Sequence, residues 1–594
     1  MEIKFLDGEN LYYSFVSGAK EVIRNRRDLN NTNVFPVADG DTGNNLATTM
    51  NSIILQSKVT PSAGITMNSI ADAALTGARG NSGIIIAQYI YGMYMEIKDE
   101  NLISITSFAN SVKNAVPHAY NAIANPVEGT IITVIRDWAE TVYRLKDSAK
   151  NFHELLTIPL EQAFASLERT TYMLKVLEKA KVVDSGAKGF FHFIKGFTEF
   201  IITGKINDEL EVIEEIFEET EILEGEPSFR YCTEALIVNE GYIDTNKIKK
   251  DLINYGDSLI VAGNNKKVRV HIHTDHPELV MSNLRHKGSI VQQKVDDMRR
   301  QYELSFAPEN KIALVTDSIA DLPKELLDKH KIHIIPLNII VGDSSYLDKV
   351  TITPEIFYEL VEELDEYPSS ALPSPKVVES LYSTLLKHYN QIIVITVAST
   401  QSGTHSVFKN VARDMSTEDK RIEVIDSKQN SGAEGLLVLK AAELIEEGKS
   451  IDNIICQIEK LRDQTKILVS VKTLKYMVRS GRLSKLSGVA GKLINLKPVV
   501  SLDETGRGKI EAKAFSIKSN INKILNIINN ANNKDKISRY VIVHANDEIR
   551  AEDLKNRMVK LLNVEPEYIM NISTIVGMSA GEGSVAVAYL SERG

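Results

Sequence analysis

Two aspartates stand two residues apart in a turn near the N-terminus, where proline and glycine interrupt the chain. The segment reads NVFPVADGDTGNN over residues 33–45, and its acids are Asp39 and Asp41. Two carboxylates this close repel one another at neutral pH unless a hard cation lies between them. Mg²⁺ favours carboxylate oxygens together with water and phosphate. The pattern predicts a magnesium site, and an ordinary polar turn is the alternative.

Three later loops are rich in small polar residues, and each precedes an apolar run typical of a buried helix. They read TGARGNSG (76–83), NPVEGTIIT (125–133) and VDSGAKG (183–189). Small residues at a helix start expose backbone N–H groups that can bind phosphate, and the first loop predicts a helix from Asn81 or Ser82. It is not a Walker motif, because no lysine follows its last glycine. Helix capping is the alternative for each loop alone, but together the loops indicate a nucleotide site.

In their order, these four motifs resemble the nucleotide-binding subunit of dihydroxyacetone kinases and, more closely, the kinase component of bacterial fatty acid kinase. The resemblance implies an all-α helical barrel over residues 1–204, with ATP and magnesium held by loops at one end. Asp39 and Asp41 match the family's metal ligands, whereas its third acidic ligand has no clear match. The implied cofactor-binding residues are Asn33, Thr42, Gly43, Asn44, Gly80, Asn81, Ser82, Gly83, Glu128, Gly129, Thr130, Asp184 and Gly186.

A second cluster lies in KVRVHIHTD, residues 267–275. Strand alternation places Arg269, His271 and His273 on one face, where both histidines can reach one ion, with Cys232 as the third ligand. Three ligands with an open fourth position are typical of a zinc site. The alternative is a pair of solvated histidines and a small buried cysteine. The resemblance favours zinc, since fatty acid kinase components carry this pairing and a zinc in a middle domain. Further ligands or their partners would be Glu234, Asp275 and His276.

Polar loops also follow apolar strands in the C-terminal half. They read LVTDSIADLP (314–323), SSALPSP (369–375), STQSGT (399–404) and MVRSGRLSK (477–485). Hydroxyl and N–H groups at the carboxyl ends of strands suit a carboxylate or phosphate, and an arginine there can stabilise added negative charge. Capping loops and solvated arginines are the alternative.

These loops resemble the DegV family of fatty-acid-binding proteins over residues 311–594. Ser370 and Ser399 match hydroxyl residues at the fatty-acid carboxylate, and Arg482 matches an arginine near the phosphoryl-transfer point. The family's histidine in G-x-H-x-G-P-G is replaced by Ser579 in GMSAGEG, and Glu582 replaces the proline. This departure leaves open whether the bound lipid is phosphorylated in this chain. The implied substrate-binding residues are Thr316, Asp317, Ser318, Ser370, Ser399, Ser402, Gly403, Thr404 and Arg482.

Composition fits a multidomain cytoplasmic protein. The 594 residues carry a net charge of −10, which argues against a nucleic-acid partner, and the two cysteines exclude a disulfide framework. The N-terminus has no signal-peptide pattern. We expect an all-α kinase domain at 1–204, an acidic linker at 205–227, an α+β middle domain at 228–305 and a two-lobed α/β DegV-like domain at 311–594. The last should contain strands at 312–316, 332–337, 392–397, 422–425, 467–471, 540–544 and 585–590, in a largely parallel sheet.

The combined motifs predict an ATP-dependent phosphotransferase that converts a protein-bound fatty acid to an acyl phosphate. Asp39, Asp41 and Arg482 are the expected catalytic residues. A carboxylate is ionised at neutral pH, so the enzyme must supply position, metal and positive charge rather than a general base. The alternatives are a dihydroxyacetone or small-ketone kinase and a lipid-binding sensor with a regulatory kinase domain. Expected cofactors are ATP, Mg²⁺ and Zn²⁺. Expected partners are a fatty acid, stand-alone DegV-type proteins and a second copy in a homodimer, with at most peripheral membrane contact and no transmembrane segment.

Overall fold

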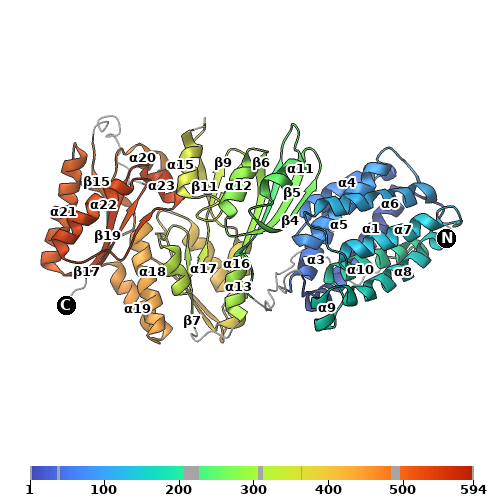
Figure 1. Ribbon diagram of the computed structural model, residues 1–594. Coiled ribbons are helices and arrows are strands. Elements are labelled where there is room, and N and C mark those ends of the chain that lie inside the picture. Colours follow the sequence, from blue (N-terminus) through green and yellow to red (C-terminus); the bar gives the residue numbers. More distant parts are fainter. Residues whose placement is uncertain are drawn as a thin grey trace. The chain divides into compact units, whose positions relative to one another are not determined.

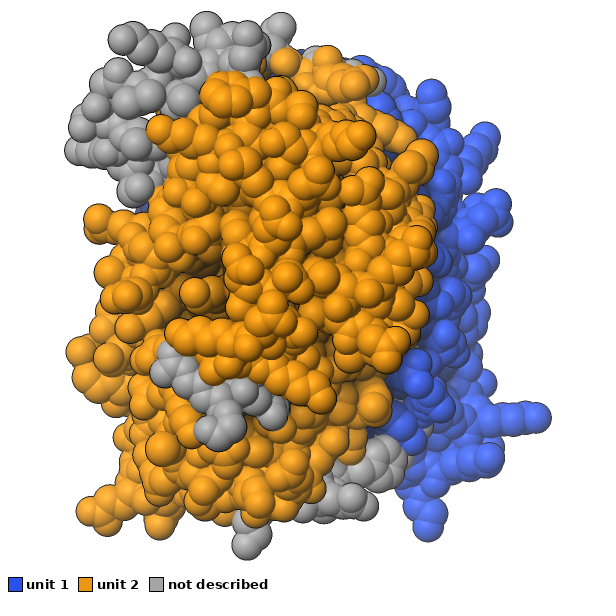
Figure 2. Space-filling model, turned by 90° about the vertical axis from the view of Figure 1, so that its left-hand side faces the viewer, with its two compact units in different colours: residues 1–306 blue, residues 307–594 orange. Residues whose placement is uncertain are grey.

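The computed structural model describes residues 3–35, 40–206, 226–305, 312–362, 364, 366–482 and 496–591. The chain forms two compact units, residues 1–306 and 307–594 (Figure 2). Asp39 and the greater part of the predicted acidic linker, residues 207–225, lie outside the described residues. No helix in the described ranges combines the length and apolar character needed to cross a membrane.

The N-terminal part of the first unit is helical, as predicted. Its longer helices pack in the order α1, α3, α4, α5, α6, α7, α8 and α10, and α10 packs back on α1, so the helices close a ring (Figure 1). A left-handed Gly204, with φ 64°, ends the last helix. The elements are β1 (Phe5–Leu6), α1 (Gly8–Arg24), α2 (Arg26–Asn31), α3 (Thr42–Gln56), α4 (Ala63–Gly77), α5 (Gly80–Ile97), β2 (Ile103–Ser104), α6 (Ile105–Ala122), α7 (Ile131–Leu145), α8 (Phe152–Met173), α9 (Lys175–Ala180) and α10 (Ser185–Thr203).

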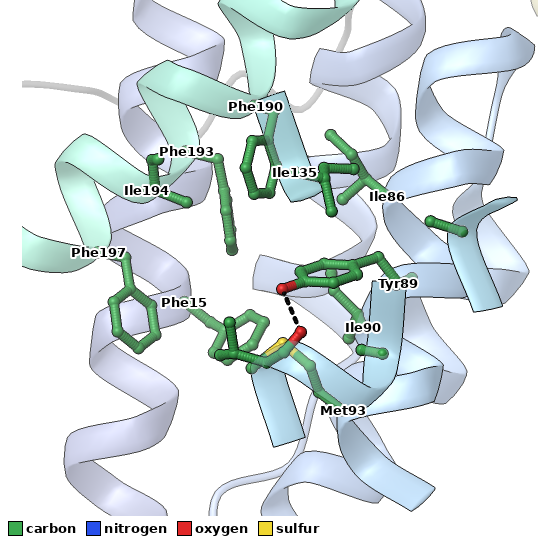
Figure 3. Packing of buried hydrophobic residues seen from close by; sticks show 14 of the residues in the cluster. Phe15, Ile86, Tyr89, Ile90, Met93, Ile135, Phe190, Phe193, Ile194 and Phe197 are labelled. Carbon is green, nitrogen blue, oxygen red and sulfur yellow. Dashed lines mark hydrogen bonds between the residues drawn. The ribbon is translucent and has the colours of Figure 1, made fainter. Parts of the chain in front are cut away.

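Aromatic and aliphatic side chains pack together inside this ring (Figure 3). The Phe15 ring meets Phe193 and Phe197 at centroid distances of 5.5 and 5.6 Å, both edge-on. The buried Tyr89 hydroxyl donates to the Val112 carbonyl at 2.9 Å, so its polar atom is satisfied. Because the interior is apolar, the polar loops identified in the sequence are confined to the ends of the helices.

The middle domain is α+β, as predicted. A four-stranded antiparallel sheet has the strand order β4-β5-β3-β6. Strand β4 packs on α5, and its Ile260 and Ala262 join the hydrophobic core of the helical ring. This contact explains why the polar face of β5 is buried and not solvated. The elements are β3 (Tyr231–Val238), α11 (Thr245–Leu252), β4 (Gly256–Gly263), β5 (Lys267–Thr274), α12 (Pro277–Arg285), β6 (Ser289–Asp297) and α13 (Met298–Ser305).

The second unit has the predicted two-lobed α/β architecture. In its first lobe, the sheet β13-β12-β7-β8 is entirely parallel, and a small antiparallel sheet β10-β9-β11 adjoins it in sequence. Strand β8 is shorter than predicted because Pro336 follows it. The elements are β7 (Ile312–Asp317), α14 (Lys324–Lys329), β8 (His333–Ile335), β9 (Asn338–Val341), β10 (Ser344–Leu347), α15 (Pro354–Glu362), β11 (Ser369–Ala371), α16 (Pro375–His388), β12 (Gln391–Thr396), α17 (Thr404–Met415), β13 (Arg421–Asp426), α18 (Ser431–Glu446) and α19 (Ile451–Arg462).

The second lobe corrects the prediction of a largely parallel sheet. Its strand order is β16-β15-β14-β19-β17-β18, and β17–β18 is the parallel pair while the other pairs described are antiparallel. Continuous apolar strands show that both faces are covered, but they do not fix strand direction. Helix α18 contacts the sheets of both lobes. The elements are β14 (Thr465–Ser470), α20 (Lys475–Ser480), β15 (Val499–Leu502), β16 (Gly508–Ala512), α21 (Ile517–Lys534), β17 (Ile537–His544), α22 (Glu548–Leu562), β18 (Ile569–Asn571), α23 (Thr574–Ala580) and β19 (Val585–Ser591).

Candidate nucleotide, metal and lipid sites

Glycine allows three of the four polar loops of the first unit to touch. A Cβ at Gly80 would lie 2.4 Å from Asn45 Nδ2, and a Cβ at Gly186 would lie 2.5 Å from Ser82 Oγ. A larger residue at either position would require the facing side chain to move, and at Gly80 the positive φ of 57° also favours glycine. Asn45, at the end of the first motif, therefore meets the loop at 76–83, which in turn meets the loop at 183–189.

Asp184 connects the loop at 183–189 to the loop at 125–133. It precedes α10, is buried, and its Oδ2 accepts the Ala187 N–H at 2.7 Å. Its carboxylate also accepts the backbone N–H of Ile131, the first residue of α7. Burial raises the pKa of Asp184 to about 7, and the two backbone hydrogen bonds act in the opposite direction. Thr130 and Gly186 are thereby held close to one another, and the carboxylate itself serves as a cap for two helices.

Glu128 stabilises the conformation of the loop at 125–133. Its Oε1 accepts from the Tyr120 hydroxyl and from Arg136 Nη1, both at 2.8 Å, and its Oε2 accepts from the Thr133 hydroxyl at 2.6 Å. Thr133 in turn accepts the Gly129 N–H at 2.8 Å. The carboxylate is therefore occupied in fixing the loop, a role that the sequence pattern alone did not indicate.

Oxygen ligands lie beside these loops. Asp41 directly precedes α3. Burial raises the pKa of the Cys232 thiol, and nearby acidic charges, that of Asp41 among them, act in the same direction. Asn81 Oδ1 is buried without a hydrogen-bond partner among the described residues, and Asn33 is also buried. Carboxylate and amide oxygens are donors that Mg²⁺ accepts, so these residues fit the predicted ion. The elements also position Thr42 and Gly43 in the first turn of α3 and Asn44 beside α2.

The second cluster assembles through strand register. Cys232 on β3 stands opposite His273 on β5. The Nε2 atoms of His271 and His273 are 3.3 Å apart, Cys232 Sγ lies 3.9 Å from His271 Nδ1, and one ligand atom from each residue lies within 4.8 Å of the others. Two buried imidazoles and the sulfur of the partly buried Cys232 fit a zinc ion.

Each histidine has a carboxylate at its second ring nitrogen. His271 Nδ1 is 3.3 Å from Glu234 Oε1, and His273 Nδ1 is 3.2 Å from Asp257 Oδ1. Carboxylates in this position orient metal-binding imidazoles and leave Nε2 for the ion. Sequence reasoning considered Glu234 but missed Asp257, because its proximity depends on the pairing of β4 with β5.

Glu234 also belongs to the phosphate loop. Its Oε1 accepts the Gly80 N–H at 2.7 Å, and its Oε2 pairs with Arg79 at 2.9 Å. Burial alone would raise the pKa of Glu234, but the His271 hydrogen bond and the Arg79 charge hold it well below its usual range. This capping carboxylate explains why α5 begins at Gly80, slightly before the predicted start.

Arg269 joins the middle domain to the end of α4. The side chain is 1% exposed, and its Nη2 donates to the Thr76 carbonyl and, at 3.0 Å, to Gln292 Oε1. Burial lowers its pKa to about 10. Lys267, two residues earlier, contacts Asp72 at 2.5 Å. Basic side chains of β5 thus hold Thr76, the first residue of the loop at 76–83.

A cavity of about 110 Å³ lies in the second unit, between residues of its two lobes. Its polar lining includes Ser370, Ser402 and Arg482 from the predicted set, together with Ser579. Apolar side chains make up much of the rest, among them Leu337, Val397, Ile467, Val469, Val543, Ile572 and Ile575. A cavity that combines hydroxyl groups, a guanidinium and many apolar side chains suits an amphiphilic carboxylate.

Other predicted substrate-binding residues are engaged elsewhere. Thr316 donates to the Ile395 carbonyl at 2.8 Å, and Ser318 donates to Asp348 at 2.8 Å. Ser399 does not line the described cavity, and its hydroxyl donates to Asp426 at 2.5 Å. These side chains hold the loops that surround the cavity.

Asp317 is likewise committed to the backbone. Its carboxylate accepts the N–H groups of Ile319 and Val397, both at 2.9 Å. Burial raises its pKa to about 6. Gly403 caps α17, and Thr404 lies 2.7 Å from the Ser402 hydroxyl, so this loop reaches the cavity through Ser402.

Three family models match successive parts of the chain. Residues 36–199 match the DAK2 domain, residues 228–305 match the middle domain of fatty acid kinase-like proteins, and residues 311–592 match the DegV family. The DAK2 match begins after α1 and α2, and the change from the middle domain to the DegV match coincides with the boundary between the two compact units. They define a fusion of a DAK2 domain, a fatty acid kinase-like middle domain and a DegV domain, as the motifs indicated.

Individual relatives agree with these models. A DegV domain-containing protein of Clostridium acetobutylicum is 33% identical over 283 residues, which are 48% of this chain and 99% of the relative. The chain belongs to the DegV family. Protein YloV of Bacillus subtilis is 31% identical over 327 residues, 53% of this chain, and the match spans 59% of the length of YloV. A crystal structure of DegV, a fatty acid binding protein from Bacillus subtilis, has 29% identity and a TM-score of 0.44, covering 48% of this chain and 100% of that one.

Proposed function

We propose that the chain is an ATP-dependent acyl kinase that phosphorylates a protein-bound fatty acid. The matches to the DAK2 domain, the fatty acid kinase-like middle domain and the DegV family support a role in fatty-acid phosphorylation or binding. The observation that carries the proposal is the meeting of the glycine-rich loops beside Asp41, in one chain with a cavity lined by Ser370, Ser402 and Arg482.

The reaction joins a carboxylate oxygen of the fatty acid to the γ-phosphorus of ATP while the bond to the β-phosphate oxygen breaks and ADP leaves. The carboxylate is already ionised, so no side chain has to remove a proton. Asp41, together with Asp39, would hold Mg²⁺, which neutralises phosphate charge. The backbone N–H groups of Asn81, Ser82 and Gly83 would bind phosphate at the start of α5.

The acceptor half needs a different set of contacts. The Ser370 and Ser402 hydroxyls would donate hydrogen bonds to the fatty-acid carboxylate, and the apolar cavity would hold the acyl chain. The Arg482 guanidinium would stabilise the negative charge of the transferred phosphoryl group. Cys232, His271 and His273 would hold zinc in the neighbouring middle domain.

A lipid sensor with a regulatory kinase domain is the second candidate. It is favoured by Ser579, which lines the cavity where the family motif has histidine. In that case the second unit retains lipid, and any phosphorylation acts on lipid held by a separate DegV-type protein.

The test is to incubate the purified chain with ATP and Mg²⁺ and either oleate or dihydroxyacetone, with and without a stand-alone DegV-type protein. Oleate-dependent ADP formation by the chain alone supports the proposal. Formation only with the added protein supports the sensor role of the second unit. Formation with dihydroxyacetone, or with neither substrate under any condition, contradicts an acyl kinase.

A further inference from the structure

One buried carboxylate is shared by the zinc cluster and the phosphate loop. Glu234 Oε1 lies 3.3 Å from His271 Nδ1 and 2.7 Å from the Gly80 N–H, and Oε2 lies 2.9 Å from Arg79. The side chain is 4% exposed. Water therefore cannot readily replace a lost contact, and any movement of the carboxylate must be shared by its partners.

The register of the sheet explains this position. Glu234 stands directly opposite His271 in the β3–β5 pair, on the face that packs toward the helical ring. With Nδ1 of His271 facing Glu234, its Nε2 is left for a metal ion. Gly80 is the first residue of α5, so the same carboxylate fixes the start of the helix whose following N–H groups would bind phosphate.

Other hydrogen bonds described between the two domains involve residues outside the zinc cluster. Gly263 donates to Gln88 at 2.7 Å, and Lys267 and Arg269 contact Asp72 and Thr76. Among the hydrogen bonds described, Glu234 is the side chain that contacts both a zinc-binding residue and the phosphate loop. A ligand on either side thus biases the same group.

We propose that Glu234 couples zinc binding at Cys232, His271 and His273 to nucleotide binding at residues 80–83. Zinc on His271 orients the imidazole and holds Glu234, which keeps Gly80 and Arg79 in the arrangement that accepts phosphate. Coupling between binding equilibria is reciprocal, so the nucleotide must strengthen zinc binding by the same factor. The inference rests on the proposed function, because the ligand of the loop is taken to be ATP.

The experiment measures zinc affinity by competition with a chromophoric chelator, with and without a saturating non-hydrolysable ATP analogue and Mg²⁺. We expect the analogue to tighten zinc binding by roughly tenfold in the wild-type chain, within the usual range of such couplings. In Glu234→Gln the analogue should leave zinc affinity unchanged, so that the ratio of zinc affinities with and without the analogue is one. A neutral amide no longer holds both His271 and the loop at residues 79–80. Asp257→Asn is the matched control: it should weaken zinc binding, since Asp257 orients His273, yet preserve the ratio, since Asp257 does not contact the loop.

If the wild-type chain binds the analogue saturably but its zinc affinity does not change, the coupling is overturned while the proposed acyl kinase activity is not. Failure of the analogue to bind overturns the proposed function and the coupling with it. A wild-type ratio that persists in Glu234→Gln overturns the role of Glu234. If circular dichroism shows that this variant does not fold, Glu234→Asp takes its place. Its shorter side chain keeps the charge but cannot span both partners, so an unchanged ratio there also overturns the role of Glu234.

Discussion

The Asp41 carboxylate precedes α3 at the place where the glycine-rich loops meet. We expect Asp41→Asn to abolish ATP turnover while the chain stays folded, because the variant loses the charge of the carboxylate proposed to bind magnesium without losing side-chain volume. Turnover is measured as ADP release and folding by circular dichroism. Asp99→Asn, an exposed position beyond α5, is the control and should behave as wild type. Activity near the wild-type level in Asp41→Asn would rule out its metal-binding role.

The family resemblance places both Ser370 and Ser399 at the fatty-acid carboxylate, but the structure distinguishes the two serines. Ser370 lines the cavity, whereas the Ser399 hydroxyl donates to Asp426. We expect Ser370→Ala to reduce the fatty acid that copurifies with the chain, because a hydrogen bond to a charged carboxylate contributes about 1.5–3 kcal/mol. Ser399→Ala should have a smaller effect. Mass spectrometry of an organic extract measures both, and the reverse order would contradict the assignment.

Arg482 should act at a different step. We expect Arg482→Ala to leave lipid retention largely intact and to lower phosphorylation, because its proposed partner is the transferred phosphoryl group and not the fatty-acid carboxylate. Retention and turnover are measured on the same preparation. Loss of lipid with unchanged turnover per bound lipid would assign Arg482 to binding instead.

Some of the site residues were predictable from the sequence and others were not. The i, i+2 spacing of His271 and His273 fixes their common strand face, and this was enough to predict the cluster that the structure assembles. The partnership of Asp257 with His273 depends on which strands pair, and the capping of Gly80 by Glu234 depends on how two domains pack. Neither follows from local spacing.

At the level of elements, the approach of α10 to α5 depends on Gly186. A Cβ there would lie 2.5 Å from Ser82 Oγ but 3.4 Å from Ser82 Cβ. We expect Gly186→Ala to destabilise the chain by about 1–3 kcal/mol through overpacking, partly offset by the better helix propensity of alanine. Adding Ser82→Ala removes the colliding oxygen and should restore stability, as measured by thermal unfolding. Equal unfolding temperatures for the single and double variants would contradict this contact.

The loop after β10 should give the second unit a characteristic pH dependence. Burial raises the pKa of Asp348 to about 6, and its carboxylate accepts from Thr574 N–H and the Ser318 hydroxyl. The folded state then binds more protons than the unfolded state between about pH 4 and pH 6, so this group lowers the free energy of unfolding as pH rises through that window. Two pKa units correspond to about 3 kcal/mol.

Asp348→Asn removes this titration and keeps a similar shape. We therefore expect the stability of the variant, relative to wild type, to increase as pH rises from about 4 to 6 and then to level off. Urea unfolding of the full chain at a series of pH values measures the difference. A difference that is constant over this range would contradict a raised pKa for Asp348.

In the second unit, sequence patterns predicted where the strands lie but not in which direction they pair. Apolar runs predicted the strands of the parallel sheet, including β7, β12 and β13, because burial on both faces leaves a continuous signal. The same signal in β14, β17 and β19 suggested parallel strands, yet these strands pair antiparallel. Strand direction depends on the path of the connections, which hydrophobicity does not report.

On the scale of the whole molecule, one chain carries both the glycine-rich loops proposed to bind nucleotide and the cavity proposed to bind lipid, in two separate compact units. A free fatty acid is sparingly soluble and amphiphilic. A protein module that buries the acyl chain can keep the carboxylate accessible for phosphorylation. We propose that a carboxylate oxygen of this bound fatty acid, and not water or a hydroxyl group, accepts the γ-phosphoryl group of ATP.

The most direct test supplies oleate labelled with ¹⁸O in both carboxylate oxygens, together with ATP, Mg²⁺ and hydroxylamine, with a stand-alone DegV-type protein added in a parallel reaction. An acyl phosphate is attacked by hydroxylamine at its acyl carbon, so the released phosphate keeps the bridging carboxylate oxygen. The acyl-kinase proposal predicts acyl hydroxamate and an equal amount of phosphate carrying one ¹⁸O by mass spectrometry. Phosphate without label in both reactions, with no hydroxamate, would contradict it.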